Sequence, residues 1–286
     1  NKNDKELCGY MQNTIGYTYK LLCEDNTQQK ETDIRKENKW YHKLWKNIVR
    51  YCIKGEGTTT TKDTENSIED WKRQAEIYLK KSVENNPKGR YHQNLGAYYA
   101  TIRDYDKALE QYKLAFNAEK RDDKIYNLIG SVLLYRAEMK LGISERFQKG
   151  IVLSEITLDI IDEEDRLNIQ NDIKHAYEWL NLAIKQVNPI INAYYNYSKA
   201  CIYDSLFLGG GSQKMNEADK YLNTVEIIWN MNHSEKPKGY LYTRRNYWEA
   251  NKEYDKALEI NQVIMKVDNS GDARAAERVY DSKKRN

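Results

Sequence analysis

The sequence predicts an all-α protein, an α-solenoid of stacked helix-turn-helix hairpins. A pentapeptide, Tyr-Asp-Lys-Ala-Leu, occurs at Tyr105–Leu109 and again at Tyr254–Leu258, each time after an acidic residue. Only 3 of the 286 residues are Pro and 14 are Gly, which is few for a protein built on β-hairpin turns. Charged residues make up 31% of the chain and the mean hydropathy is −0.91, as expected of an elongated stack with much surface per residue.

The aromatic content argues against intrinsic disorder. The chain has 24 Tyr and 6 Trp, which supply large areas for burial. Tyr outnumbers Phe 24 to 3. This bias has two interpretations: the composition of an AT-rich coding sequence, or Tyr side chains lining a recognition groove.

The charge and cysteine content narrow the function classes. The net charge of +3 gives no basic footprint for nucleic acid or an anionic membrane, and no apolar run approaches a membrane span. The four cysteines lack CxxC spacing, which favours free thiols in a reducing compartment and a cytoplasmic location. Because Asn1 is not Met, a removed leader or a fragment stays compatible with this prediction.

One segment carries small and aromatic residues at the spacing of a helical hairpin. In order they are His92, Leu95, Gly96, Tyr99, Ala108, Tyr112 and Ala115. This pattern resembles the tetratricopeptide repeat (TPR), with Trp-x2-Leu-Gly-x2-Tyr followed by Ala-x3-Phe, in which His92 replaces Trp and Tyr112 replaces Phe. Gly130 follows Gly96 by 34 residues, the period of that family. The small residues Gly96 and Ala108 predict a close crossing of the two helices.

The resemblance implies a right-handed solenoid of about 12–13 helices with an insertion in the middle. We expect an N-terminal helix within 1–34 and a TPR-like solenoid over 35–286. Its units are predicted at about 35–88, 89–122, 123–189, 190–237 and 238–271, with a capping helix at 272–284. Within the first unit, the Thr58–Thr61 run predicts a mobile loop.

Two places depart from the repeat pattern. Gly142-Ile143-Ser144 breaks the third unit, so residues 144–172 are predicted to be an insertion or a lengthened helix pair, helical over Glu145–Asp172. The second-helix pattern then returns at Ala176. In the last unit Arg245 stands at the small-residue position, which predicts a splayed or atypical hairpin.

No catalytic grouping, metal site or cofactor site is predicted. The four His are scattered and lack the HExxH pattern, and the Gly209–Ser212 run lacks the Lys-Ser/Thr of a phosphate loop. Asp162–Asp165 lacks the ligand spacing of an EF-hand and is interpreted as a solvated helix end or turn. We therefore expect that the chain is not an enzyme.

In TPR proteins the first helix of each hairpin lines the concave surface, so the resemblance implies a ligand groove. Amide, cationic and phenol groups at these positions suit an extended peptide. The alternative is that they are polar only because they are exposed. The candidate groove residues are Arg90, Gln93, Lys124, Asn127, Ser131, Tyr195, Lys199, Tyr203, Tyr242, Asn246 and Glu249.

The predicted function is a protein- or peptide-binding scaffold with an unidentified partner. Two alternatives remain open: a sensor or regulatory domain of a larger protein whose enzymatic part lies outside this chain, and a helical-repeat nucleic-acid binder. Balanced charge disfavours the last. No membrane insertion is expected.

Overall fold

The structure, a computed structural model, describes residues 68–119, 123–232, 236–268 and 271–284, together with Gln12, Asn13 and Gly16. The chain divides into two compact units, 1–120 and 121–286. The predicted helix within 1–34, the first half of the first repeat and the Thr58–Thr61 loop lie outside the described residues, apart from the three named positions.

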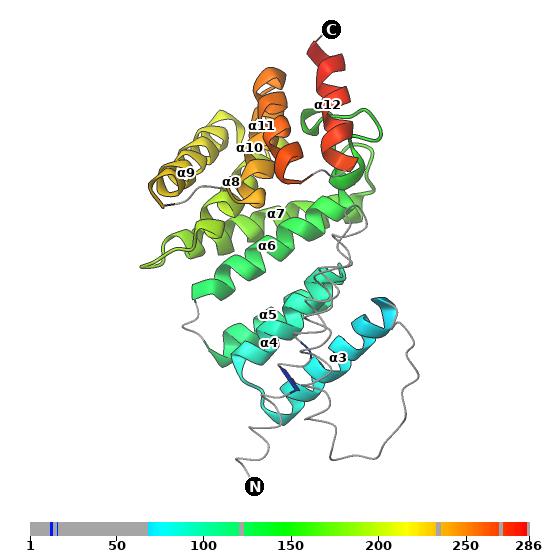
Figure 1. The fold of residues 1–286 in the computed structure, drawn as a ribbon, viewed down its shortest axis with the longest axis vertical. Coiled ribbons are helices and arrows are strands. Elements are labelled where there is room, and N and C mark those ends of the chain that lie inside the picture. Colours follow the sequence, from blue (N-terminus) through cyan, green and yellow to red (C-terminus); the bar gives the residue numbers. More distant parts are fainter. Residues whose placement is uncertain are drawn as a thin grey trace. The chain divides into compact units, whose positions relative to one another are not determined.

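The described residues form ten α-helices and no strand, which confirms the all-α prediction. Unit 1 holds α3, α4 and α5, and unit 2 holds the remainder (Figure 1). The bounds are α3 Ile68–Asn85, α4 Gly89–Thr101, α5 Tyr105–Ala118, α6 Asp123–Lys140, α7 Glu163–Ile184, α8 Ile191–Phe207, α9 Gly211–Asn232, α10 Lys238–Ala250, α11 Tyr254–Val267 and α12 Gly271–Lys284.

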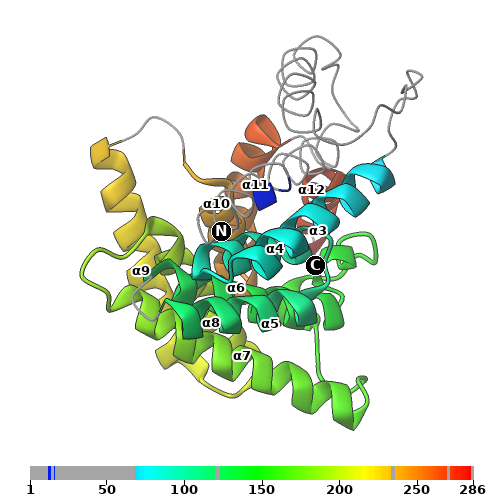
Figure 2. The ribbon, with the colours of Figure 1, turned by 90° about the horizontal axis from the view of Figure 1, so that it is seen from below.

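Helices that follow one another in the chain pack as hairpins. The pairs are α4 with α5, α6 with α7, α8 with α9 and α10 with α11, and α12 then packs on α11. Figure 2 shows unit 2 from a second direction, with α9 beside α8. Both copies of the pentapeptide begin the second helix of a hairpin, at Tyr105 and Tyr254.

Glycine at the helix crossing is required by space, as the spacing predicts. A Cβ atom at Gly96 would stand 2.7 Å from the Tyr112 ring and 3.2 Å from the Ala108 carbonyl oxygen. At Gly130, in the same register, it would stand 2.5 Å from Leu180 Cγ and 3.2 Å from the Ala176 carbonyl oxygen. The two hairpins therefore use the same close approach of first and second helices.

The hairpin of α10 and α11 forms without a small residue at this position. Arg245 is only 2% exposed, and its Nη1 donates to Asn261 Oδ1 at 3.0 Å. Asn261 follows Ala257 by four residues, as Tyr112 follows Ala108, so a polar pair replaces the glycine-to-side-chain contact. Arg245 also binds Asp272 of α12 at 3.2 Å. The hairpin is thus atypical in chemistry, and its two helices remain packed together.

The helix predicted over 145–172 is wrong for its first part. Residues 143–162 instead form two short 3-10 helices, η2 (Ile143–Glu145) and η3 (Leu153–Glu155), joined by loops. Gly150 has φ +70°, a left-handed conformation that interrupts a helix. Helix α7 begins only after Asp162, whose Oδ1 accepts from the Asp165 N–H at 2.9 Å. The acidic cluster is therefore an N-cap and a first turn that favour helix initiation.

We predict that Gly130→Ala destabilises the protein. The added methyl group would overlap Leu180 and approach the Ala176 carbonyl. The cost of overpacking, about 1–3 kcal/mol, exceeds the gain in helix propensity of about 1 kcal/mol. Gly271→Ala is the matched control, since nothing lies within 4 Å of a Cβ there. Urea unfolding measures both free energies; equal stability of the two variants would contradict close packing at Gly130.

Candidate functional site

A buried ion pair joins the irregular segment 143–162 to helix α10. Arg146 follows η2 and is 4% exposed, and Glu249 lies in the last turn of α10 and is fully buried. Arg146 Nη2 stands 3.1 Å from Glu249 Oε2, and its Nε donates to Oε1 at 3.3 Å. Arg146 Nη2 also donates to Asn246 Oδ1 at 2.9 Å. The guanidinium thus contacts two residues of one face of α10.

The Glu249 carboxylate receives further donors. The backbone N–H of Leu153 donates to Oε1, and the Tyr280 hydroxyl of α12 donates to Oε2 at 3.0 Å. Burial by itself lowers the pKa of the Arg146 guanidinium, but the Glu249 charge outweighs burial and raises that pKa above its usual range. The Arg146 guanidinium therefore stays charged, and the hydrogen bonds of the pair compensate for the loss of water.

The turn after Arg146 is held by apolar packing as well. Phe147 and Val152 share a buried cluster with Ala276, Val279 and Tyr280 of α12. The Phe147 and Tyr280 rings meet edge to face, with centroids 5.6 Å apart. At the end of η3, Glu155 accepts from Lys283 Nζ of α12. Charged and apolar contacts therefore fix both ends of the 146–155 segment.

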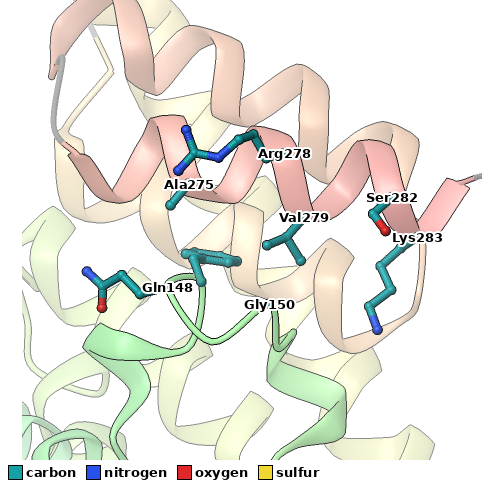
Figure 3. A pocket seen from close by; sticks show the side chains of 8 residues that line it. Gln148, Gly150, Ala275, Arg278, Val279, Ser282 and Lys283 are labelled. Atoms are coloured by element: carbon teal, nitrogen blue, oxygen red, sulfur yellow. The ribbon is translucent and has the colours of Figure 1, made fainter.

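A cleft of about 320 Å³ lies between this segment and α12 (Figure 3). One wall is the turn at residues 147–150 and the other is the side of α12 that carries Ala275, Arg278, Val279 and Ser282. Figure 3 shows Arg278 and Gln148 toward one end of the cleft, and Ser282 and Lys283 toward the other. The lining residues are Phe147, Gln148, Gly150, Ala275, Arg278, Val279, Ser282 and Lys283.

Several of the predicted groove residues are not open to a ligand. Asn246 and Glu249 bind Arg146 of the same chain. Asn127 is buried and accepts from Asn196 Nδ2 at 3.0 Å. Ser131 is buried and its hydroxyl donates to the Leu128 carbonyl at 3.0 Å. The expectation that these positions face an open groove is therefore corrected.

The predicted pair on α8, Lys199 and Tyr203, packs against α6. Lys199 Nζ lies 3.0 Å from Glu138 Oε1, and the Tyr203 hydroxyl donates to the same oxygen at 2.5 Å. Tyr203 is fully buried, so it too lacks an open surface. Burial lowers the pKa of Lys199, but the Glu138 carboxylate and Tyr135 outweigh this and raise it overall, so Lys199 remains a cation.

The remaining five candidate groove residues are at least partly exposed to solvent. Lys124 and Arg90 are exposed, whereas Gln93, Tyr195 and Tyr242 are half-buried. Tyr195 packs on Gly239 of α10, and burial chiefly raises its pKa to about 12. The Tyr242 hydroxyl donates to Asp268 Oδ2 at 3.1 Å. Arg90 and Gln93 belong to unit 1 and the others to unit 2.

The sequence did not indicate three residues that matter here: Tyr135 and Met139 of α6, and Arg146 of the segment after α6. Tyr135 and Met139 are 39% and 49% exposed, although both are large. Lys199 Nζ lies 5.2 Å from the centroid of the Tyr135 ring. The steps of four from Ser131 to Tyr135 and Met139 carry the signal, because they continue one face of the helix. Arg146 has no local signal, since its partner lies 103 residues away.

Within the described part of the chain, no three His, Cys, Asp or Glu side chains gather as a metal site. None of the helices there is long and apolar enough to cross a membrane.

The class that the packing defines is an all-α helical repeat of TPR-like hairpins with divergent sequence. No family model matches the chain, and no curated protein does. Among solved structures, a tetratricopeptide repeat protein from Parabacteroides merdae is 11% identical, with a TM-score of 0.37, covering 91% of this chain and 90% of that one. Pseudomonas aeruginosa pilF is 14% identical, with a TM-score of 0.30, covering 74% and 90%.

We predict that Arg146→Met lowers the free energy of unfolding by about 3–5 kcal/mol, because Glu249 would keep a buried charge without its partner. Lys149→Met is the control: its pair with Glu145 is exposed and contributes less than about 1 kcal/mol. Chemical denaturation measures both. In the double variant Arg146→Met/Glu249→Leu the loss should be smaller than the sum of the single losses. A similar small cost for Arg146→Met and Lys149→Met would contradict the role of the pair.

The Glu155 contact should be sensitive to acid. Burial raises the pKa of its carboxyl, but Lys283 and the Val152 N–H outweigh burial and lower that pKa below its usual value. A lowered pKa stabilises the fold above the unfolded-state pKa, and this contribution is lost as the pH falls through the folded-state value. Glu155→Gln should therefore cost under about 1 kcal/mol at neutral pH and nothing near pH 3. Unfolding at several pH values checks this; a difference that persists in acid would contradict it.

Proposed function

We propose that the chain is a non-catalytic scaffold that binds a protein or peptide through a surface of unit 2, the α6/α8 face. This face consists of Tyr135, Met139, Tyr195 and Lys199. The observation that carries the proposal is the exposure of Tyr135 and Met139, one turn apart on α6. Aromatic side chains and Met are enriched in protein interfaces, where they bury area on binding.

The neighbours of these side chains suit a peptide. The Lys199 ammonium lies over the Tyr135 ring, and Glu138 pairs with the same ammonium. Tyr195 adds a half-buried ring on the adjacent helix. Apolar contacts with a fixed cation nearby provide both binding energy and orientation for an extended or helical peptide.

Ion pairing weighs against the nucleic-acid alternative. Arg136 binds Asp172 in a bidentate pair, at 2.8 and 2.6 Å, and Lys199 binds Glu138. Arg244 likewise binds Asp219 at 2.6 Å. Cations neutralised by carboxylates release few counterions from a phosphate backbone, so affinity for nucleic acid should be low. A sensor domain within a larger protein remains compatible with the proposal, since such a domain also binds through a surface.

The one described cysteine suits a reducing compartment such as the cytoplasm. Cys201 is fully buried as a free thiol, and burial raises its pKa well above the usual range. A thiol of this kind is inert, which is compatible with a structural role.

We predict that the double variant Tyr135→Ser/Met139→Ser loses binding to peptides that a random-sequence library selects on the wild-type protein. The loss should be about tenfold or more, because two exposed apolar contacts disappear. Isothermal titration measures the affinity. The matched control is Ile227→Ser/Met231→Ser on α9, which removes two exposed apolar residues of the same spacing elsewhere.

The control variant should bind as the wild type does. If both double variants bind equally well, or if no peptide is selected, the α6/α8 face is not the binding surface.

A further inference from the structure

We propose that the cleft between the turn at residues 147–150 and α12 is a second binding site, specific for an acidic segment of a partner protein. An apolar side chain of that segment would lie on the cleft floor, and an adjacent carboxylate would bind Arg278. This site uses other elements than the α6/α8 face, so it does not rest on the function proposed for that face.

The cleft combines an apolar floor with a polar rim. Phe147, Ala275 and Val279 are buried side chains at its base. The rim carries Gln148, Arg278, Ser282 and Lys283, and none of the lining residues is acidic. Of its two cations, Lys283 is paired with Glu155, and Arg278 supplies the positive charge that faces a ligand. Its charge is complementary to a carboxylate.

Arg278 is the cation best placed to bind. Its side chain is exposed and lines the cleft. It makes no hydrogen bond or ion pair with another described residue, although Asp281 lies three residues further along α12. Lys283, by contrast, binds Glu155. A guanidinium can hold a carboxylate through two parallel hydrogen bonds, which gives geometric specificity as well as attraction.

The wall opposite α12 is anchored at both ends by contacts within the chain. Arg146 anchors its start to Glu249, and the Leu153 N–H and Glu155 anchor its end. Phe147 is fixed against Tyr280. A site that is already ordered loses less conformational entropy on binding, so a small contact area gives more affinity.

The size of the cleft favours part of a polypeptide. Its volume of about 320 Å³ is near the lower end of the range for ligand pockets, about 300–1,000 Å³. Gln148 and Ser282 are exposed on the rim, and their amide and hydroxyl groups can bond a peptide backbone that continues into solvent. A ligand segment with one apolar side chain, for the floor, and one neighbouring carboxylate, for Arg278 on the rim, would fill the cleft.

The test uses a short fluorescent peptide in which a leucine stands between two glutamates, and the same peptide with glutamines. Fluorescence anisotropy with the full chain should show binding of the acidic peptide at low salt, about tenfold weaker for the glutamine form. Arg278→Gln should weaken the acidic peptide by a similar factor and leave the glutamine form unchanged. Lys266→Gln, an exposed cation of α11 that does not line the cleft, is the matched control and should bind as the wild type.

A second variant tests the cleft independently of charge. Ser282→Trp places a large side chain at the exposed rim and should abolish binding of the acidic peptide, while circular dichroism shows the same thermal unfolding. Equal binding of the two peptides, no effect of either variant, or equal displacement by inorganic phosphate and by the peptide would each overturn the proposal. Tyr135→Ser/Met139→Ser should bind the acidic peptide normally, which separates this site from the α6/α8 face.

Discussion

The organisation of unit 2 depends on the buried pair of Arg146 and Glu249. Two charges leave water to form it, and six hydrogen bonds compensate for that loss. Four reach the Glu249 carboxylate, from Arg146, Leu153 and Tyr280, and Arg146 donates two more, to Ile143 and Asn246. A pair of this kind adds more to conformational specificity than to net stability in some proteins. Here it selects one position for a segment that has little regular structure of its own, and thereby joins that segment to α10 and α12.

This attachment changes which surfaces of the repeat are available for binding. In a regular array the first helix of every hairpin leaves its inner face open. On α10 the residues at that face, Asn246 and Glu249, bind the chain's own Arg146. The irregular segment after α6 therefore occupies the polar groups of these two α10 residues. The two binding surfaces proposed above, the α6/α8 face and the cleft beside α12, lie away from these α10 residues.

The regular part of the fold was predictable because its determinants are local. Gly96 and Gly130 show in the sequence as small residues one period apart, and the structure explains them by the space left beside Tyr112 and Leu180. The candidate site was less predictable, because burial of a polar residue depends on partners distant in the chain. Arg146 and Glu249 are 103 residues apart, and no pattern in either neighbourhood indicates the other. Polar residues at inner positions were accordingly expected to be exposed.

The two departures from the repeat pattern are physically connected. Arg245 stands where other hairpins have a small residue, and its guanidinium lies 4.8 Å from the centroid of the Phe147 ring. Arg146 lies 4.1 Å from the same centroid, so two guanidiniums contact one ring of the insertion. Such contacts are attractive when they are buried. Arg245 extends this link to Asn261 and Asp272, on the next two helices. A residue without a side chain at this position would leave Phe147 without this contact. The large residue in the last hairpin and the irregular segment after α6 are therefore in direct contact, and Arg245 links that segment to α11 and α12 while α10 and α11 stay packed together.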